Sequence, residues 1–357
     1  MFNILLFLII SIMYIFFYKQ TKKTKNIVFL RTCFILLTFL VIFRSFSIGN
    51  DTEKYIEVFK SAAEKKWYLL FVTKLEKGYV FINILLSYLT NNARVFLIIL
   101  GIIFNYSIYE FIKKNSSNYY LSIITYLFFL YYYTSMTAFR QFFAISILLY
   151  ALNFLKEKQL LKYILAVFIA FLFHKTAIIA LLIYPLYYMK YNNKRSLILI
   201  ITSVLIVLTI EPLLKYITDL GIIKYEYKVR ETGLSIANIL YSLVYFALYI
   251  YAVICKNNNN TEKYDFTIYI LLLSFCINLI GIRMNIIHRL SDYFSIYTII
   301  LLPNLIEEMK KKEIKRIVIG IYIIFLVGYS SVISFLKPEW NTAYNYRICS
   351  IKKDCFK

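Results

Sequence analysis

Residues 119–155 read YYLSIITYLFFLYYYTSMTAFRQFFAISILLYALNFL, an apolar stretch in which Arg140 is the one charged side chain. A charge at the centre of a bilayer costs at least about 2.5–3.5 kcal/mol on insertion scales. Arg140 therefore lies either at the edge of a membrane, where this cost is small, or beside a polar cavity. Both alternatives place the apolar runs that flank it in a membrane.

The rest of the chain has the same apolar character. Of its 357 residues 61% are hydrophobic, and the mean hydropathy is +0.67. Soluble domains are about 45–50% apolar on average, so the excess is too large for one buried core and predicts a polytopic membrane protein. The first apolar run, residues 2–18, has no basic leader and no small-residue cleavage site, so we expect it to be retained as a span.

The net charge of +22 does not indicate a nucleic-acid-binding protein. The basic residues lie mainly in short clusters between apolar runs, as in the cytoplasmic loops of membrane proteins, where they also favour anionic lipids. We therefore expect membrane lipids as partners and no nucleic acid. The sequence contains no zinc-type cluster, Walker loop or GxGxxG motif, so we expect no metal and no cofactor. Cys33, Cys255 and Cys276 are predicted to be packing residues, whereas Cys349 and Cys355 can form a disulfide if the tail is extracytoplasmic.

The apolar runs predict an all-α bundle of about 12 transmembrane helices in a single transmembrane domain, residues 1–357. Several runs are shorter than the 17–25 residues of a typical span, as is tolerated where a helix lines a polar cavity. Residues 76–92 are predicted to form an interfacial or re-entrant helix. The predicted spans lie near residues 2–18, 27–48, 94–112, 119–138, 141–155, 160–173, 175–189, 196–211, 235–255, 264–282, 290–306 and 315–335.

The basic clusters also predict which side of the membrane each loop occupies. When KQTKKTK (19–25) is placed in the cytoplasm, the later clusters fall on the same side, provided that residues 76–92 do not cross. The extracytoplasmic segments are then about 49–93, 212–234 and the tail 336–357. Unusual polar side chains gather at the outer ends of the spans and predict a charged extracytoplasmic cavity: Arg44, Asp51, Arg140, His174, Lys175, Arg283, His288, Arg289 and Asp292.

Each of these side chains has a structural explanation and a functional one. Arg140 either reaches lipid phosphates at the membrane edge or binds a substrate phosphate through its planar guanidinium. His174 is either a packed residue or a general base. Asp51 either caps a helix over 51–60, with Lys54 and Tyr55 in its first turns, or belongs to the site.

The segment RMNIIHRLSDYF (283–294) concentrates these polar side chains. In a helix, residues three or four apart share a face, so Asp292 can orient His288 or pair with Arg289. The alternative is an interfacial capping cluster.

Five segments together resemble the EpsG-type exopolysaccharide proteins, which belong with the Wzy-type polysaccharide polymerases. The resemblance covers residues 40–305, and its most specific parts contain Arg140 with Gln141, and His174. Lys175 departs from the small residue that usually follows this histidine. The segments occur in the family's order: RSFSIGNDTEKYIEVF (44–59), EKGYVFIN (76–83), FRQFFAISILLYALNFL (139–155), FLFHKTAIIALLIYPL (171–186) and HRLSDYF (288–294).

The resemblance implies a glycosyltransferase in a bacterial cell membrane that needs no cofactor. It would move a growing glycan from undecaprenyl pyrophosphate onto a newly flipped repeat unit, with a flippase and a chain-length regulator as possible partners. We expect His174, as the base, and Arg140 and Arg289, as cations for the leaving pyrophosphate, to be catalytic. Asp51 or Asp292 is the alternative base, and Arg44 or Arg283 is a further candidate cation. Trp67 and Tyr68 would stack on sugar rings. The expected substrate-binding residues are Arg44, Asp51, Tyr55, Glu76, Gln141, Lys175, Arg283, His288 and Asp292.

Two other functions use similar residues. A lipid-linked oligosaccharide flippase or transporter would bind the same pyrophosphate, but it should show internal repeats and charges in the middle of its spans. A membrane O-acyltransferase acting on glycans would need catalytic groups that can be reached from the cytoplasm.

Overall fold

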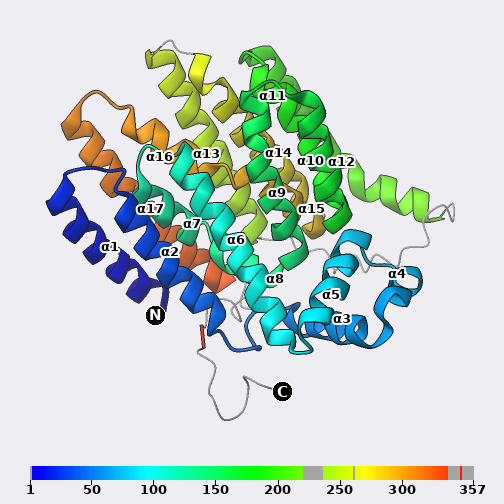
Figure 1. The fold of residues 1–357 in the computed structure, drawn as a ribbon. Helices are drawn as coiled ribbons and strands as arrows, with labels where there is room; N and C mark the ends of the chain where they lie inside the picture. Colours follow the sequence, from blue (N-terminus) through cyan, green and yellow to red (C-terminus); the bar gives the residue numbers. More distant parts are fainter. Residues whose placement is uncertain (1, 220–235, 260–261, 337–345, 348–357) are drawn as a thin grey trace. The chain divides into compact units, whose positions relative to one another are not determined.

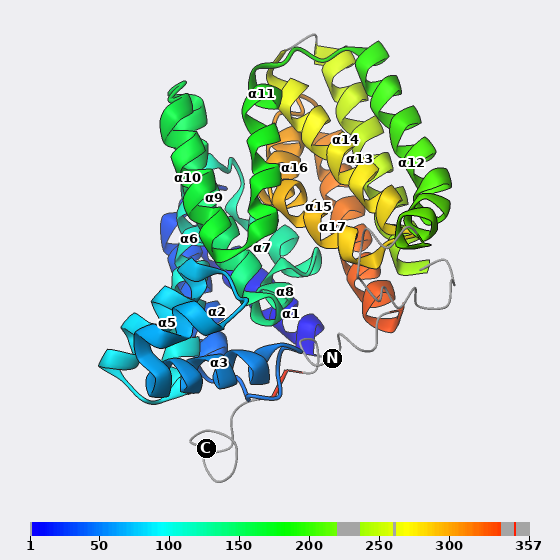
Figure 2. The ribbon, with the colours of Figure 1, turned by 90° about the vertical axis from the view of Figure 1, so that its right-hand side faces the viewer.

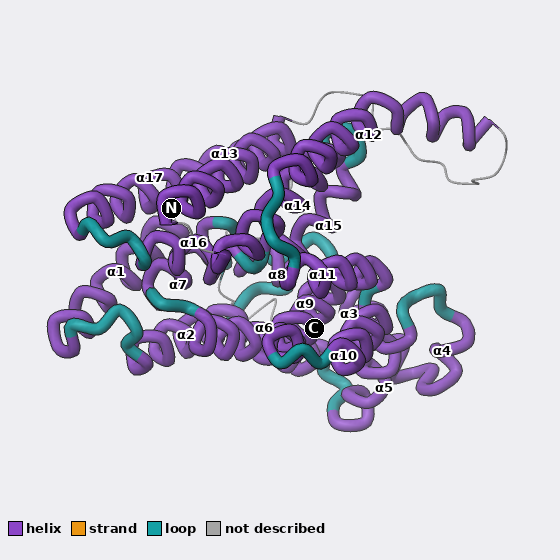
Figure 3. The backbone as a smooth tube through the Cα atoms, turned by 90° about the horizontal axis from the view of Figure 1, so that it is seen from above, coloured by secondary structure: helices purple, strands orange, loops and turns teal. Residues whose placement is uncertain are grey.

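The computed structural model describes residues 2–219, 236–259, 262–336 and 346–347 (Figure 1). Across these ranges the regular elements are helices, and Figure 3 shows only helices and loops there, as the all-α prediction requires. Five helices within the described ranges are long and apolar enough to cross a membrane, so the protein is a multi-pass membrane protein; the number of twelve spans stays a prediction. The five candidate spans are Phe2–Thr21, Ala93–Asn115, Asn193–Ile210, Ile236–Asn257 and Lys312–Leu336.

The chain divides into two compact units, each of which is described by itself. The first comprises Met1–Ile178 and Ile299–Lys357, and the second comprises Ile179–Thr298. The first unit contains α1 (Phe2–Thr21), α2 (Ile27–Ile42), α3 (Thr52–Lys65), η1 (Lys66–Tyr68), α4 (Leu69–Val72), α5 (Lys77–Leu89), α6 (Ala93–Asn115), α7 (Tyr119–Phe128), α8 (Tyr131–Thr137), α9 (Phe139–Lys156), α10 (Leu160–Phe173), most of α16 (Thr298–Glu307) and α17 (Lys312–Leu336).

The second unit is built on packed long helices. Figure 2 shows α12, α13 and α14 side by side, and α15 packs against α14. The predicted outer segment 212–234 lies outside the described residues from position 220 onward, as does most of the predicted tail with Cys349 and Cys355. The elements are the second half of η2 (Lys175–Leu182), then α11 (Ile183–Tyr188), α12 (Asn193–Asp219), α13 (Ile236–Asn259), η3 (Glu262–Tyr264), α14 (Asp265–Gly281) and α15 (Asn285–Ser295).

Asparagine side chains begin several helices of the first unit. Asn26 accepts hydrogen bonds from the backbone N–H groups of Val28 and Phe29 at the start of α2. Asn92 and Asn118 cap α6 and α7 in the same way. Each side chain satisfies N–H groups that have no partner within the helix, which fixes where the helix begins.

The predicted span boundaries are wrong at three places. The run 119–138 is two helices, because Leu130 adopts a left-handed backbone with φ of 68° between α7 and α8. The run 27–48 is helical only to Ile42, and the run 290–306 is divided between α15 and α16. Apolar residues predict burial in lipid or protein, but they do not reveal a break in a helix when both sides of the break are apolar.

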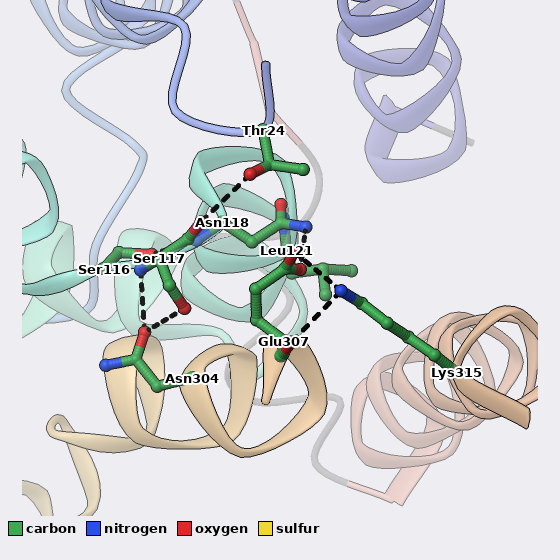
Figure 4. A network of polar contacts seen from close by, with 8 residues as sticks. All are labelled: Thr24, Ser116, Ser117, Asn118, Leu121, Asn304, Glu307 and Lys315. Atoms are coloured by element: carbon green, nitrogen blue, oxygen red, sulfur yellow. Dashed lines mark hydrogen bonds and ion pairs between the residues drawn. The ribbon is translucent and has the colours of Figure 1, made fainter. Parts of the chain in front are cut away.

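A polar network ties the loop between α6 and α7 to α16 and α17 (Figure 4). The Oδ1 atom of Asn304 accepts two hydrogen bonds from Ser117, both at 2.7 Å, and its Nδ2 donates to the Asn115 carbonyl at 2.9 Å. Glu307 accepts from Asn118 at 3.1 Å and pairs with Lys315 at 2.7 Å. These bonds join segments almost 190 residues apart in the sequence, so the last two helices are anchored to the first part of the chain.

Candidate functional site

Three helix ends meet in the first unit and bring together three residues from distant parts of the sequence. Glu76 is at the N-cap position of α5, and Arg140 is in the first turn of α9. His174 is the C-cap residue of α10, with an extended backbone that ends the helix. Because α10 packs against both α5 and α9, these ends converge.

The carboxylate of Glu76 lies between the other two side chains. Its Oε2 is 2.6 Å from Nη1 of Arg140, and its Oε1 is 3.4 Å from Nδ1 of His174. That Nδ1 atom is buried and has no partner within hydrogen-bond geometry among the described residues, so Glu76 faces it at ion-pair distance only. The side chains of Arg140, Glu76 and His174 are 28%, 10% and 22% exposed. The group is therefore largely enclosed, with the arginine and the histidine still accessible.

The electrostatics of the three helix ends favour a charged Glu76. A helix N-terminus stabilises an anion and disfavours a cation, so Glu76 is well placed, and Arg140 needs the carboxylate as a counterion. Burial alone would raise the pKa of Glu76, but the polar contact with His174 and the charge of Arg140 lower it to about 2. Glu76 is therefore a fixed anion at neutral pH and a poor proton acceptor.

Gly78 allows α5 to approach α10 closely enough for this geometry. A Cβ at this position would lie 2.7 Å from the carbonyl oxygen of Leu172, in the last turn of α10. Contacts that short do not occur between real side chains and backbone, so any larger residue would move one helix. The glycine two residues after Glu76 thus sets the distance between Glu76 and His174.

Aromatic rings surround the guanidinium group of Arg140. Its Cζ lies 5.8 Å from the centre of the Tyr79 ring, and it also interacts with the Tyr55 side chain, whose hydroxyl donates to the Thr137 carbonyl at 3.3 Å. Tyr55 packs against Tyr79 and Phe139 with ring centres 6.0 and 5.5 Å apart. A cation over such rings gains a favourable interaction when water is excluded.

Arg44 is a second buried cation in this unit. It is 5% exposed, its Nη1 donates to the Met136 carbonyl at 3.1 Å, and its Cζ lies 4.8 Å from the centre of the Phe139 ring. Its Nη2 is buried with no hydrogen-bond partner among the described residues. Burial lowers the pKa of Arg44 to about 10, so the group stays charged at neutral pH. A buried cation without a carboxylate partner is suited to bind an anion.

His288 lies in a separate polar group of the second unit. Its Nδ1 is 2.6 Å from Oδ1 of Asn278, whose Nδ2 donates to the Ser274 carbonyl and to Ser291. These donations fix the orientation of the amide, so the Asn278 oxygen faces His288 and the ring must carry a proton on Nδ1. The ring also stacks on Tyr241 at 4.3 Å.

The chain matches the EpsG family over residues 27–348. The chain belongs to the EpsG family. This is a family of polysaccharide polymerases, and the match spans nearly the whole chain, as the resemblance indicated. The chain matches none of the curated proteins and none of the solved structures with which it was compared.

The structure of this EpsG-family protein separates the predicted site residues into two groups. Glu76, Arg140, His174 and Tyr55 come together in the first unit, with Gln141 buried in α9 and Lys175 exposed. Arg283 precedes α15, and His288, Arg289 and Asp292 are on that helix, in the second unit.

One detail of the prediction needs correction, and another needs an addition. The side chain of Asp51 makes no cap hydrogen bond at the start of α3, although it lies at the N-cap position and pairs with Lys54 at 3.4 Å. Asn278, which was not predicted, contacts the Nδ1 atom of His288; that Asp292 orients His288 or pairs with Arg289 stays a prediction. The amide of Asn278, ten residues before His288, is within reach because α15 packs closely against the end of α14. A Cβ at Gly281 would lie 3.2 Å from the His288 backbone nitrogen.

Sequence reasoning missed three contributors to the two groups: Gly78, Tyr79 and Asn278. The signal for Gly78 was its position in GYVFIN directly after the charged pair Glu76–Lys77. The signal for Asn278 was an amide inside an apolar run, because a buried amide requires hydrogen-bond partners. Tyr79 had no distinguishing signal in a chain with 35 tyrosines.

Proposed function

We propose that this protein polymerises a surface polysaccharide at the extracytoplasmic face of a bacterial cell membrane. It would join oligosaccharide repeat units that are linked to undecaprenyl pyrophosphate. The family assignment supports the polymerase activity. The observation that carries the mechanism is the carboxylate of Glu76 shared between Arg140 and His174.

Glu76 orients His174 for proton transfer. A carboxylate only accepts hydrogen bonds, so the His174 nitrogen that faces it, Nδ1, carries the proton of the neutral ring. The lone pair is then on Nε2, on the other side of the ring. Glu76 is a positioning residue in this scheme, and Nε2 of His174 is the general base.

The reaction is a glycosyl transfer in which one bond forms and one breaks. A sugar hydroxyl of the incoming repeat unit gives its proton to Nε2 of His174, and its oxygen forms a bond with the anomeric carbon of the growing chain. The bond from this carbon to the pyrophosphate oxygen breaks, and its electron pair leaves with the lipid pyrophosphate. The growing chain ends on the carrier of the incoming unit.

The cations would stabilise the leaving group. One Nη atom of Arg140 is engaged by Glu76, and the guanidinium also interacts with the Tyr55 side chain; its N–H groups beyond these two contacts would bind phosphate oxygens. Arg44, buried without a carboxylate partner among the described residues, is the second candidate in this unit. We keep Arg289 as a third cation, with Arg283, His288 and Asp292 as substrate contacts in the second unit.

The same proposal includes the membrane arrangement. About twelve helices of a single transmembrane domain would cross the membrane, with a charged cavity open to the extracytoplasmic face. A flippase would supply the lipid-linked units, and a chain-length regulator would limit the polymer. No metal or cofactor takes part in any step derived above.

The glycan profile of a deletion strain tests the function. Single repeat units on the carrier or the surface, with long chains lost, would support the polymerase. Loss of all surface material with lipid-linked units retained inside would indicate a flippase. An unchanged ladder would contradict both and favour an acyltransferase that modifies the glycan.

A further inference from the structure

Helices α3 and α5 form a small layer with two different outer faces. They pack against each other and appear as one blue and cyan group with α4 in Figure 1. The outer face of α3 is charged and exposes Glu53, Lys54, Glu57, Lys60 and Glu64. The outer face of α5 is apolar and exposes Phe81, Leu85, Tyr88 and Leu89.

The short α4 and the η1 turn extend the apolar face. Their exposed side chains are Trp67, Tyr68, Phe71 and Val72, and Phe71 is 83% exposed. The ring of Trp67 lies 5.9 Å from Phe81 and 6.5 Å from Tyr88, so both helices contribute to one surface. We call the eight exposed side chains of α5, α4 and η1 the aromatic patch. A contiguous apolar surface of this kind marks a site of interaction.

The side chains around the aromatic patch match a phospholipid surface. Tryptophan and tyrosine concentrate at the headgroup level of membranes, and lysines beside them reach lipid phosphates. Lys65, Lys74 and Lys77 are exposed at the ends of η1, α4 and α5. The Nζ of Lys66 lies 4.5 Å from the centre of the Tyr88 ring, which places a positive charge directly on the patch.

The length of α5 argues against a transmembrane span. It has 13 residues, which at 1.5 Å per residue give about 20 Å, against about 30 Å of hydrocarbon core. One face of it is buried against the protein through Tyr79, Val80, Asn83 and Ile84. A short helix with one buried face, one apolar exposed face and flanking lysines is typical of a segment lying in the interface plane.

We infer that the aromatic patch lies in the headgroup region of a phospholipid leaflet, with the charged face of α3 in water. The layer thereby fixes the depth of the first turn of α5. Glu76 immediately precedes that turn, so Glu76, Arg140 and His174 are held at headgroup level. This location also explains why Arg140 can lie next to apolar runs: a charge at the membrane interface has little desolvation cost.

Depth-dependent quenching tests the inference without any assay of activity. The chain has two tryptophans, so Trp340→Phe leaves Trp67 as the only indole. This variant is reconstituted in vesicles of phosphatidylcholine and phosphatidylglycerol that contain lipids brominated on the acyl chain. We expect Trp67 fluorescence to be lower than in unbrominated vesicles, because an interfacial indole lies next to the acyl chains.

A matched probe on the other face of the layer is the control. Lys60→Trp in a Trp67→Phe, Trp340→Phe background places the indole on the charged face of α3, where we expect no quenching. Phe71→Trp in the same background is a second probe of the aromatic patch and should be quenched like Trp67. The inference is overturned if brominated lipid changes neither the emission of Trp67 nor that of the tryptophan in Phe71→Trp. A response of Trp67 to oligosaccharide but not to brominated lipid would also overturn it, and would make the patch a sugar-binding surface.

Discussion

Glu76 holds its two neighbours through different atoms: Oε2 faces Arg140, and Oε1 faces His174. Each oxygen has lone pairs left, but the carboxylate cannot contact both neighbours if it moves or if the side chain that carries it is shorter. The arrangement therefore depends on the length of the side chain as well as its charge. We therefore expect the contributions of Glu76, Arg140 and His174 to stability and activity to be strongly coupled.

Replacing Arg140 by lysine should lower the polymerisation rate about 10–100-fold. Lysine keeps the charge and can pair with Glu76, but it lacks the planar fork that also offers N–H groups to phosphate. The rate of chain elongation by the reconstituted variant measures this. Arg31→Lys is the matched control, since Arg31 is exposed and, among the described residues, hydrogen-bonds to the Tyr109 hydroxyl at 3.4 Å rather than to a carboxylate. Equal elongation rates for Arg140→Lys and the wild type would contradict the proposal that the Arg140 guanidinium binds phosphate.

The Glu76→Gln variant should show a pH-dependent loss of stability. The pKa of Glu76 is lowered from its ordinary 4.5 to about 2 in the folded protein, so its charged form stabilises the fold fully above pH 4.5. The stabilisation is lost as the pH falls through the folded pKa. The difference in melting temperature between wild type and variant should be constant from neutral pH to about 5 and shrink at lower pH. A difference that grows on acidification would contradict the ion pair.

At the residue scale, the sequence identifies unusual side chains but not their partners. Arg140 and His174 stand out because each is polar within an apolar context. Glu76 stands in a mixed segment and precedes Arg140 by 64 residues, so spacing in the chain carries no information on their contact. Their meeting follows from the packing of α5, α9 and α10, which periodicity cannot predict.

At the scale of elements, the close approach of α5 and α10 has a direct test in Gly78→Ala. The added Cβ would lie 2.7 Å from the Leu172 oxygen, so α5 must move and the Glu76–His174 contact must lengthen. We expect a loss of both polymer yield and melting temperature. Gly320→Ala is the control, because nothing lies within 4 Å of its Cβ on α17, and alanine there should stabilise the helix by about 0.5–1 kcal/mol. Equal behaviour of the two variants would contradict the role of Gly78.

The apolar runs predicted most helices because a helix is the one structure that satisfies its backbone inside a membrane. They failed where two helices follow each other without a charged residue between them, as at Leu130, which is buried and has a left-handed backbone conformation. They also placed the start of the helix after Arg140 too late. Phe139 begins α9, so Arg140 belongs to its first turn and faces the end of α5.

At the scale of the whole molecule, composition and charge clusters predict the class and the sidedness for a simple reason. Both are sums over many residues, so errors at single positions have little effect. The two units and the network around Asn304 depend instead on specific long-range contacts. Such contacts leave no periodic trace in one sequence, so they could not be predicted.

The sidedness can be checked with single cysteines in a variant without the native ones. Lys60→Cys should react with an impermeant maleimide in spheroplasts, because α3 is predicted to be extracytoplasmic. Lys23→Cys and Lys158→Cys should react only after the membrane is permeabilised, since both belong to cytoplasmic basic clusters. Labelling of Lys158→Cys in sealed spheroplasts would mean that residues 76–92 cross the membrane.

The most direct test of the central claim is elongation by the reconstituted His174→Ala variant. Wild type and variant are supplied with the same undecaprenyl-pyrophosphate-linked repeat units, and both the glycan ladder and the released lipid pyrophosphate are measured. The account predicts that the variant still folds, with a small fall in melting temperature from the lost contact with Glu76, but forms no chain longer than a single unit and releases no carrier. A folded variant that produces the wild-type ladder at the wild-type rate would contradict the claim that His174, held by Glu76, is the base of a polymerase.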